Sequence, residues 1–330
     1  LGVFVAGLVQ LLLQLPFLSR RGLLPVPRWG WAHAGVRRML KLMLPVLFGS
    51  SVAQISILFD TLIASFLAAG SISWLYYSDR LMEFPLGVFG IAVATVMLPS
   101  LSDEHSKESP EAFSAMLDWA LRLVLLIALP AAVGLIILAE PLLAAIFYGG
   151  VFTATDVTMA TASLIAYALG LLGFILVKVL VTGYFARQDT RTPVRIGIAA
   201  LTLNMVLNLV FVVSLVRAGY AAPHAGLAAA TTIAALFNAA LLLRGLLRSG
   251  VYRAAPGWAA YASRVCVATA LMGAAVYWLQ LSYGDWLALS FADRGLALTV
   301  CVITGVVVYA AACYLGGLRP ASLGLRGRGL

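Results

Sequence analysis

Runs of about 20 apolar residues, separated by short polar stretches, recur along the whole chain. A bilayer core about 30 Å thick needs a helix of this length, because each helical residue rises about 1.5 Å. The pattern therefore predicts an all-α, polytopic transmembrane helical bundle. Nine spans are expected, over residues 1–18, 43–69, 80–101, 119–147, 158–184, 195–216, 225–247, 261–281 and 295–317.

Lysine and arginine gather in alternate connections between these runs. One set of connections holds Arg20, Arg21, Arg28, Arg37, Arg38, Lys41, Lys107, Arg187, Arg191, Arg195, Arg244, Arg248, Arg253, Arg264, Arg319, Arg326 and Arg328. The opposite set holds only Arg217 and Arg294. Because basic connections stay in the cytoplasm, the pattern predicts a cytoplasmic carboxyl terminus and an outer start at Leu1. Membrane orientation thus explains the net charge of +9, and nucleic acid is not an expected partner.

Hydrophobic residues make up 62% of the chain and charged residues 11%, so the chemistry available inside the membrane is sparse. The three cysteines have no metal-ligand spacing, and no catalytic triad or phosphate-binding glycine loop occurs. A membrane enzyme acting on a polyprenyl phosphate would need a carboxylate-rich, magnesium-binding face. The acidic connector at 102–119 offers carboxylates without such a scaffold, so no enzyme is expected. Within this connector, Ser109 and Pro110 are typical of a helix start.

Proline and glycine interrupt or flank several spans, where kinks are expected. These residues are Pro45, Pro85, Pro99, Pro130, Pro141, Gly87, Gly90, Gly170 and Gly173.

Asp79, Arg80 and Glu83 place three ionisable groups in an apolar run. Charge in a membrane is costly, so it usually faces a partner or a wet cavity and marks a pathway. Asp79 and Glu83 share a helix face, since four residues separate them. One interpretation is a local salt-bridge network. The favoured one is that Arg80 faces an aqueous cavity and binds an anionic group, because a guanidinium donates two parallel hydrogen bonds to phosphate.

Lys178 stands alone in the body of a span, too far from the ends to reach the headgroups easily. A cavity-facing position is therefore expected. Its ammonium would either add a second positive contact to a phosphate or pair with a carboxylate such as Glu83.

Asp60, Asn204, Asn208 and Thr231 form a second polar set. Asn204 and Asn208 lie one helical turn apart on a single face. Carboxylate, amide and hydroxyl oxygens suit a hard cation such as sodium. Interhelical hydrogen bonding explains the asparagines and the threonine equally well.

Several long motifs resemble one family of membrane transporters. They are LPVLFGSSVAQI at 44–55, DTLIASFL at 60–67, SWLYYSDRLME at 73–83, PLGVFG at 85–90 and ARQDTRTPV at 186–194. The chain resembles the MurJ (MviN) lipid II flippases of the MOP superfamily, and the similarity covers essentially its whole length. The resemblance implies a MATE-like fold of fourteen helices in two lobes plus two extra helices.

On that resemblance, the nine spans correspond to helices six to fourteen, and the amino-terminal lobe of the same protein is missing from this chain. Residues 1–42 would hold the last helix of that lobe and a basic cytoplasmic linker. The six-helix carboxyl-terminal lobe would cover 43–250, and two extra helices with a basic tail would cover 251–330. Only the second half of the cavity would then be present.

The resemblance implies a transporter of the bacterial inner membrane that moves an undecaprenyl-linked peptidoglycan precursor by alternating access. Arg80 would match the family's essential cavity arginine, with Asp79, Glu83 and Lys178 at other charged positions of the cavity. The polar set of Asp60 and its neighbours resembles a sodium site of some members, although Asn208 stands where a carboxylate can occur. Membrane potential would drive transport, and no further cofactor is implied. The alternative is another MOP transporter, either a drug/cation antiporter or an O-antigen-type flippase.

Overall fold

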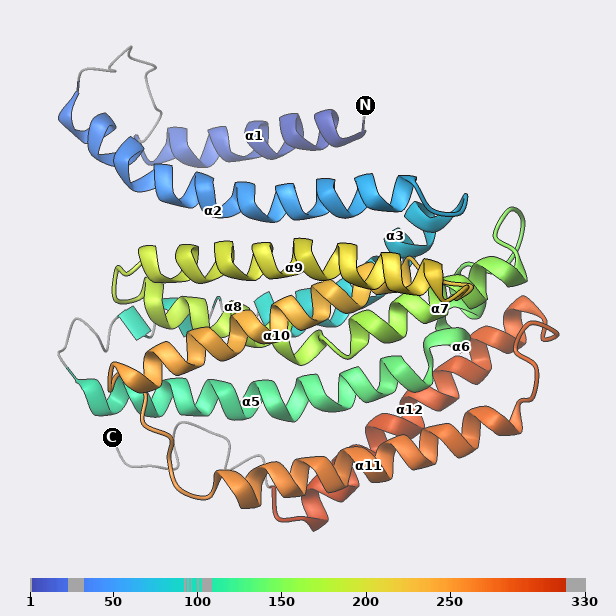
Figure 1. Cartoon of the computed structure of the whole chain (residues 1–330). Helices are drawn as coiled ribbons and strands as arrows, with labels where there is room; N and C mark the ends of the chain where they lie inside the picture. The colour runs from blue at the N-terminus through green and yellow to red at the C-terminus, as the bar shows by residue number, and fades with distance from the viewer. Residues whose placement is uncertain are drawn as a thin grey trace. The chain divides into compact units, whose positions relative to one another are not determined.

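The computed structural model describes residues 2–22, 33–91, 93, 95, 97–99, 101–102 and 109–318 (Figure 1). The basic connection at 23–32, the acidic residues at 103–108 and the basic tail at 319–330 lie outside this description. The chain divides into two compact units, Leu1–Pro45 and Val46–Leu330. The assignment of residues to lobes and extra helices stays a prediction.

The first unit holds α1 (Gly2–Arg20) and the beginning of α2 (Ala34–Ser65), which continues into the second. The second unit then contains, in order, α3 (Ser71–Pro85), the π-helix η1 (Leu86–Ile91), α5 (Pro110–Ile137), α6 (Ala139–Ile146), α7 (Ala154–Ala168), α8 (Leu171–Phe185), α9 (Arg191–Arg217), α10 (Ala225–Arg248), α11 (Trp258–Ser282) and α12 (Phe291–Leu315). The described part of the chain consists of helices and the turns and loops that join them, with one isolated bridge between Gly149 and Phe152. This confirms the predicted all-α class.

Five described helices, α5, α9, α10, α11 and α12, are long and apolar enough to cross a membrane, and α7 with α8 makes a sixth if the bent pair is one span. These correspond to the last six predicted spans. The first three predicted spans fall on α1, on α2, and on α3 with η1 and residues that are described only in part. The count of nine therefore stays a prediction.

The span predicted over 119–147 is interrupted, as expected at Pro141. Helix α5 ends at Ile137, and α6 starts after Leu138. Pro141 accounts for the break, because in a continuous helix its ring would clash with the carbonyl of Ile137. In α6 it occupies the first turn, where a missing N–H costs nothing. The expected start of α5 is confirmed, with Ser109 at the N-cap position and Pro110 as the first helical residue.

The expected kink at Gly170 is also confirmed, since the axes of α7 and α8 differ by 42° there. A Cβ on Gly170 would lie 2.5 Å from the hydroxyl oxygen of Thr232, so only glycine permits this approach. The Thr232 hydroxyl donates to the carbonyl of Ala166 at 2.6 Å, which gives a partner to a backbone group near the break. Pro85 was also expected to interrupt a span, and the π-helix η1 follows it directly.

Asp189 anchors the turn between α8 and α9. The backbone N–H of Thr192 donates to Asp189 Oδ1 at 3.0 Å. Burial acts to raise the pKa of this carboxyl, but hydrogen bonds from Thr192 and the backbone N–H of Arg191 outweigh it and lower the pKa below its usual value. The turn is thus held by a charged cap outside the apolar helices.

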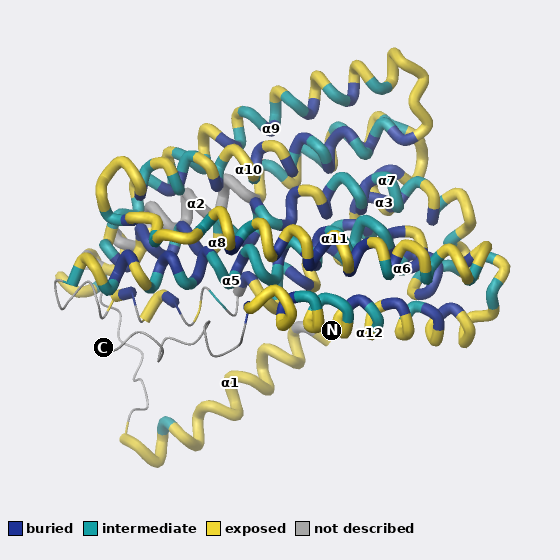
Figure 2. The backbone as a smooth tube through the Cα atoms, turned by 90° about the horizontal axis from the view of Figure 1, so that it is seen from below, coloured by how far each residue is buried: buried dark blue, intermediate teal, exposed yellow. Residues whose placement is uncertain are grey.

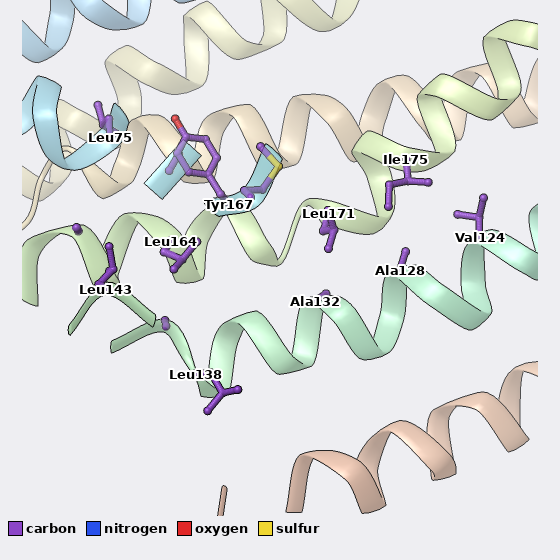
Figure 3. Packing of buried hydrophobic residues seen from close by; sticks show 14 of the residues in the cluster. Leu75, Val124, Ala128, Ala132, Leu138, Leu143, Leu164, Tyr167, Leu171 and Ile175 are labelled. Atoms are coloured by element: carbon purple, nitrogen blue, oxygen red, sulfur yellow. The ribbon is translucent and has the colours of Figure 1, made fainter. Parts of the chain in front are cut away.

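Helix α10 packs against α7, α8 and α9, while α5 packs against α8 and α11. Figure 3 shows Leu171 and Ile175 of α8 near Ala128 and Ala132 of α5. The small alanine side chains let the two helices approach closely, as is common between helices in membranes.

Helix α9 shows why this bundle belongs in lipid. Its buried positions include Ala200, Asn204, Asn208 and Val212, which recur every four residues along one face. Elsewhere it exposes large apolar side chains such as Val206 and Leu209, and Figure 2 shows the exposed positions along its outer side. Such a surface is unfavourable in water but matches acyl chains.

Candidate functional site

The first polar region, here called the arginine site, consists of Asp79, Arg80 and Glu83 of α3. Arg80 Nη1 donates to Glu83 Oε2 at 2.5 Å, and the two side chains are 52% and 47% exposed. The guanidinium also lies 4.9 Å from the ring centroid of Tyr76, one turn earlier on α3. Asp79 is within electrostatic range of both Arg80 and Glu83. The region is thus a small charged network on one helix.

The exposure of Arg80 decides what this network can do. A guanidinium has five N–H donors, and one of them has a side-chain partner in the part of the chain that the structure describes. Glu83 holds one edge of the group while the rest remains accessible. The salt-bridge interpretation and the cavity interpretation are therefore compatible, because the ion pair orients the guanidinium without closing it.

Lys178 of α8 is exposed. Its cavity-facing position and its functional role stay predictions. In the described residues Glu83 pairs with Arg80.

Lys178 lies at a different depth from Arg80. Ser78 donates to the carbonyl of Ala160 at 2.7 Å, and Trp74 donates to Asp156 at 2.6 Å, so α3 and α7 run in parallel. Arg80 follows Ser78 by two residues, whereas Lys178 follows Ala160 by eighteen residues along α7 and α8. At about 1.5 Å per residue, the two cations are roughly 20 Å apart along the helix axes.

The second polar region, here called the amide cluster, joins α2, α9 and α10. Asn208 Nδ2 donates to Asp60 Oδ1 at 2.5 Å and lies 3.2 Å from Asn204 Oδ1. Asn204 Nδ2 in turn donates to the hydroxyl of Thr231 at 3.2 Å. The structure therefore brings together all four residues that were grouped from the sequence. The interhelical hydrogen bonds expected there are present.

Burial separates the amide cluster from the arginine site. Asn204 is 3% and Asn208 is 0% exposed. Asn208 Oδ1 is buried and has no hydrogen-bond partner among the described residues. A buried acceptor without a partner is costly, so this oxygen is a candidate ligand for a cation. The described residues contain no group of three or more histidine, cysteine or acidic side chains arranged to hold a metal ion.

Tyr167 of α7 relates the two regions. It is 8% exposed and within electrostatic range of both Asp79 and Asp60. The arginine site and the amide cluster thus lie in the same compact unit, Val46–Leu330, near one buried tyrosine.

Two further residues were not recognised from the sequence. Ser56 Oγ donates to Asn204 Oδ1 at 3.1 Å and so belongs to the amide cluster. It precedes Asp60 by one helical turn, and Tyr76 precedes Arg80 by the same interval. This four-residue spacing is the signal that would have found both.

These observations define a class of protein: a polytopic helical membrane protein, with broken helices and polar side chains within an apolar bundle, as is common in transporters. Among solved structures, a multidrug resistance MATE transporter of the MOP superfamily, in an outward-facing conformation, shares the fold. Its TM-score is 0.56 at 15% identity, over 83% of this chain and 64% of that one.

A more specific similarity follows from the sequence and from a second structure. A family model described as "Lipid II flippase MurJ" matches residues 1–296. A structure titled "Lipid II flippase MurJ, inward closed conformation" has a TM-score of 0.69 at 25% identity, over 87% of this chain and 57% of that one. The chain belongs to the MurJ lipid II flippase family.

Curated relatives agree with this assignment. A probable lipid II flippase MurJ from Vibrio cholerae is 48% identical over 98% of this chain and 60% of its own length. A probable lipid II flippase MurJ from Haemophilus influenzae is 45% identical over 98% and 63%. A lipid II flippase MurJ from Burkholderia cenocepacia is 37% identical over 97% and 61%. The chain thus spans about three-fifths of the length of these relatives, which are all named as flippases.

Proposed function

We propose that this chain provides the carboxyl-terminal lobe and the last two helices of a lipid II flippase of the bacterial inner membrane. The flippase moves the undecaprenyl-pyrophosphate-linked peptidoglycan precursor to the outer leaflet by alternating access. The observation that carries this proposal is the half-exposed Arg80, held by Glu83 within the apolar bundle of a MurJ family member. Its free N–H groups suit the oxygens of a diphosphate.

The depth of the two cations supports a stepwise passage. Lys178 lies on the part of α8 that leads to the basic α8–α9 connection, while Arg80 lies nearer the opposite end. If basic connections and the carboxyl terminus are cytoplasmic, a headgroup moving outward meets Lys178 first and Arg80 second. The lipid tail stays in the hydrocarbon throughout. Membrane potential is the proposed driving force, since one charge crossing 100 mV gains about 2.3 kcal/mol.

We also propose that the amide cluster is a sodium site. Asp60, Asn204, Asn208 and Thr231 would hold the ion, which would supply positive charge beside the Asp60 carboxylate. The residues fit this use because Asn208 Oδ1 is buried without a partner. Turning the Asn208 amide would direct this oxygen, rather than the NH2 group, towards Asp60.

The transport proposal is tested with the protein expressed at its full natural length and reconstituted into vesicles containing fluorescent lipid II. We expect lipid II to become accessible on the opposite leaflet faster than in vesicles without protein. Transport of a cationic drug with no movement of lipid II would instead favour the drug/cation antiporter alternative.

The sodium proposal is tested by thermal unfolding in sodium chloride and in choline chloride of equal ionic strength. A ligand that binds only the folded state raises the midpoint with its concentration. We expect sodium to raise the midpoint for the natural sequence but not for Asp60→Asn. Equal midpoints in both salts for the natural sequence would exclude the site.

A further inference from the structure

Two buried charged residues lie outside both polar regions: Asp118 of α5 and Arg294 of α12. They are 3% and 8% exposed. Each lies where the last two helices, α11 and α12, or the connection that leads to them, meet the preceding elements α5 and α6. Since buried charges cost free energy unless they are paired and hydrogen-bonded, their contacts show what they stabilise.

Asp118 binds the connection between α10 and α11. Its Oδ1 accepts hydrogen bonds from the Tyr252 hydroxyl at 2.8 Å, the Ala255 N–H at 3.1 Å and the Trp258 indole at 2.6 Å. Its Oδ2 accepts from Arg122 Nε at 2.8 Å. The carboxylate is therefore fully used, and most of its partners lie more than 130 residues away in the sequence.

Arg122 and Ser114, one turn to either side of Asp118 on α5, extend this contact. Arg122 Nη2 donates to the carbonyl of Pro256 at 3.2 Å, and its guanidinium lies 5.0 Å from the ring centroid of Trp258. The Ser114 hydroxyl accepts from the N–H of Arg253 at 2.9 Å. Three successive turns of α5 thus fasten the α10–α11 connection along its length.

Arg294 makes a second attachment at the other end of the bundle. Its Nη1 donates to the carbonyls of Ala144 at 2.8 Å and Tyr148 at 3.3 Å, and its guanidinium lies 4.8 Å from the Tyr148 ring centroid. Nε donates to the carbonyl of Leu289 at 3.0 Å. The cation thus satisfies carbonyls at the C-terminus of α6, where positive charge is stabilising.

Between these ends the helices approach closely. A Cβ built on Gly273 of α11 would lie 3.0 Å from Val133 Cγ1 of α5. The Tyr309 hydroxyl of α12 donates to the carbonyl of Leu126 of α5 at 2.6 Å. Polar bonds at both ends and tight packing in the middle leave no layer of lipid between α5 and the last two helices.

From these contacts we infer that α11 and α12 are carried rigidly on α5 and α6, with Asp118 and Arg294 as the positioning residues at the two ends. The conformational cycle moves this assembly as one body. Sliding α11 along α5 would strip partners from a buried carboxylate and a buried guanidinium together. This inference rests on the proposed alternating-access function only for the existence of a cycle.

The test is a distance measurement by spin labelling of the full-length protein in lipid nanodiscs. One label is placed on the native, exposed Cys266 of α11 and the other on Ala115→Cys of α5, after Cys301 and Cys313 are replaced by alanine. We expect one narrow distance distribution that is unchanged by lipid II or sodium. A second distance, or a shift on adding lipid II, would overturn the inference whether or not the protein transports.

A cross-link gives an independent functional readout. Val133→Cys with Gly273→Cys, in a background lacking the native cysteines, places two thiols close enough for a disulfide. We expect the oxidised protein to flip lipid II as fast as the reduced protein. Loss of transport that reduction restores would show that α11 must move against α5. Loss of transport in both redox states would mean that the two substitutions themselves abolish transport. The distance measurement would then decide whether α11 moves against α5.

Substitutions test whether Asp118 and Arg294 hold α11 and α12 in place on α5 and α6. Asp118→Ala and Arg294→Ala are expected to broaden the distance distribution, whereas Arg294→Lys restores part of it because an ammonium still donates to the α6 carbonyls. Glu140→Gln, at an exposed acidic residue of α6, is the matched control and should change nothing. Unchanged distributions in both alanine variants would refute the positioning role.

Discussion

The arginine site and the amide cluster belong to the same compact unit, yet Arg80 is open to its surroundings and Asn208 is closed off from them. Arg80 is half-exposed and keeps unused donors. Asn208 is fully buried, and both polar contacts of its NH2 group are within the cluster. A charged group on one helix and an amide group between three helices thus have two different local environments.

The difference shows which ligand each region can accept. A diphosphate with its sugar and peptide can approach only an exposed cation, because entry into the amide cluster would require its three helices to separate. A desolvated monovalent ion needs only oxygens, and the buried cluster supplies one without a partner. This comparison supports our proposal that the open region recognises the headgroup and the closed one binds an ion.

The largest effect is expected from Arg80→Ala, which tests the role of the open region in headgroup binding. Loss of a charged hydrogen-bond donor costs about 1.5–3 kcal/mol, which corresponds to roughly 10- to 100-fold weaker headgroup binding. The variant should fail to sustain growth of a strain depleted of its own flippase, whereas Arg80→Lys should sustain partial growth. Arg217→Ala, at an exposed arginine of α9, is the control and should grow normally. Normal growth of Arg80→Ala at normal expression would remove the arginine from the mechanism.

Two substitutions of Asp60 separate charge from hydrogen bonding in the closed region. Asp60→Asn retains an oxygen for the Asn208 NH2 group, so the fold should stay close to its original stability. Asp60→Leu leaves that donor buried without its acceptor and should cost about 1–3 kcal/mol. Chemical denaturation in detergent measures both. Equal losses in the two variants would mean that the carboxylate charge, rather than its hydrogen bond, stabilises the cluster.

Some features of these regions could be predicted from the sequence, and others could not. The shared face of Asn204 and Asn208 followed from their four-residue spacing, and the kink followed from Gly170. Local spacing and backbone freedom suffice for such features. Pro141 indicated an interruption of the span at 119–147, but the apolar pattern continues across it, so hydrophobicity alone does not mark Ile137 as the end of α5.

Contacts between distant residues were beyond local patterns. Asp118 was grouped with the acidic connector, although an acid and an arginine four residues apart in an apolar helix signal a structural pair. Arg294 was one of two basic residues on the side predicted to be poor in them. That exception to the charge bias was its only signal. The different depths of Arg80 and Lys178 depend on the pairing of α3 with α7, which no single helix reveals.

A smaller effect is expected from Thr231→Val, which tests the neutral edge of the amide cluster. Valine keeps the shape of the side chain but removes the acceptor of the Asn204 NH2 group. The loss should be about 0.5–1.5 kcal/mol in unfolding experiments. Thr202→Val is matched to it, because the Thr202 hydroxyl is exposed and bonds only to the carbonyl of Ile198 in its own helix. An equal loss in both would show that burial adds nothing at Thr231.

The smallest effect is expected from Lys178→Gln. This variant tests whether every exposed cation of the bundle is needed for lipid II transport. Lys178 is exposed like Arg80, but its depth prevents both from holding one phosphate in this conformation. An exposed charge contributes about 0.2–1 kcal/mol, so the initial rate of lipid II translocation should fall by at most about fivefold. Lys178→Arg should retain the rate, since it preserves the charge. If Lys178→Gln were as inactive as Arg80→Ala, the two cations would act together on one headgroup, and the stepwise passage would be wrong.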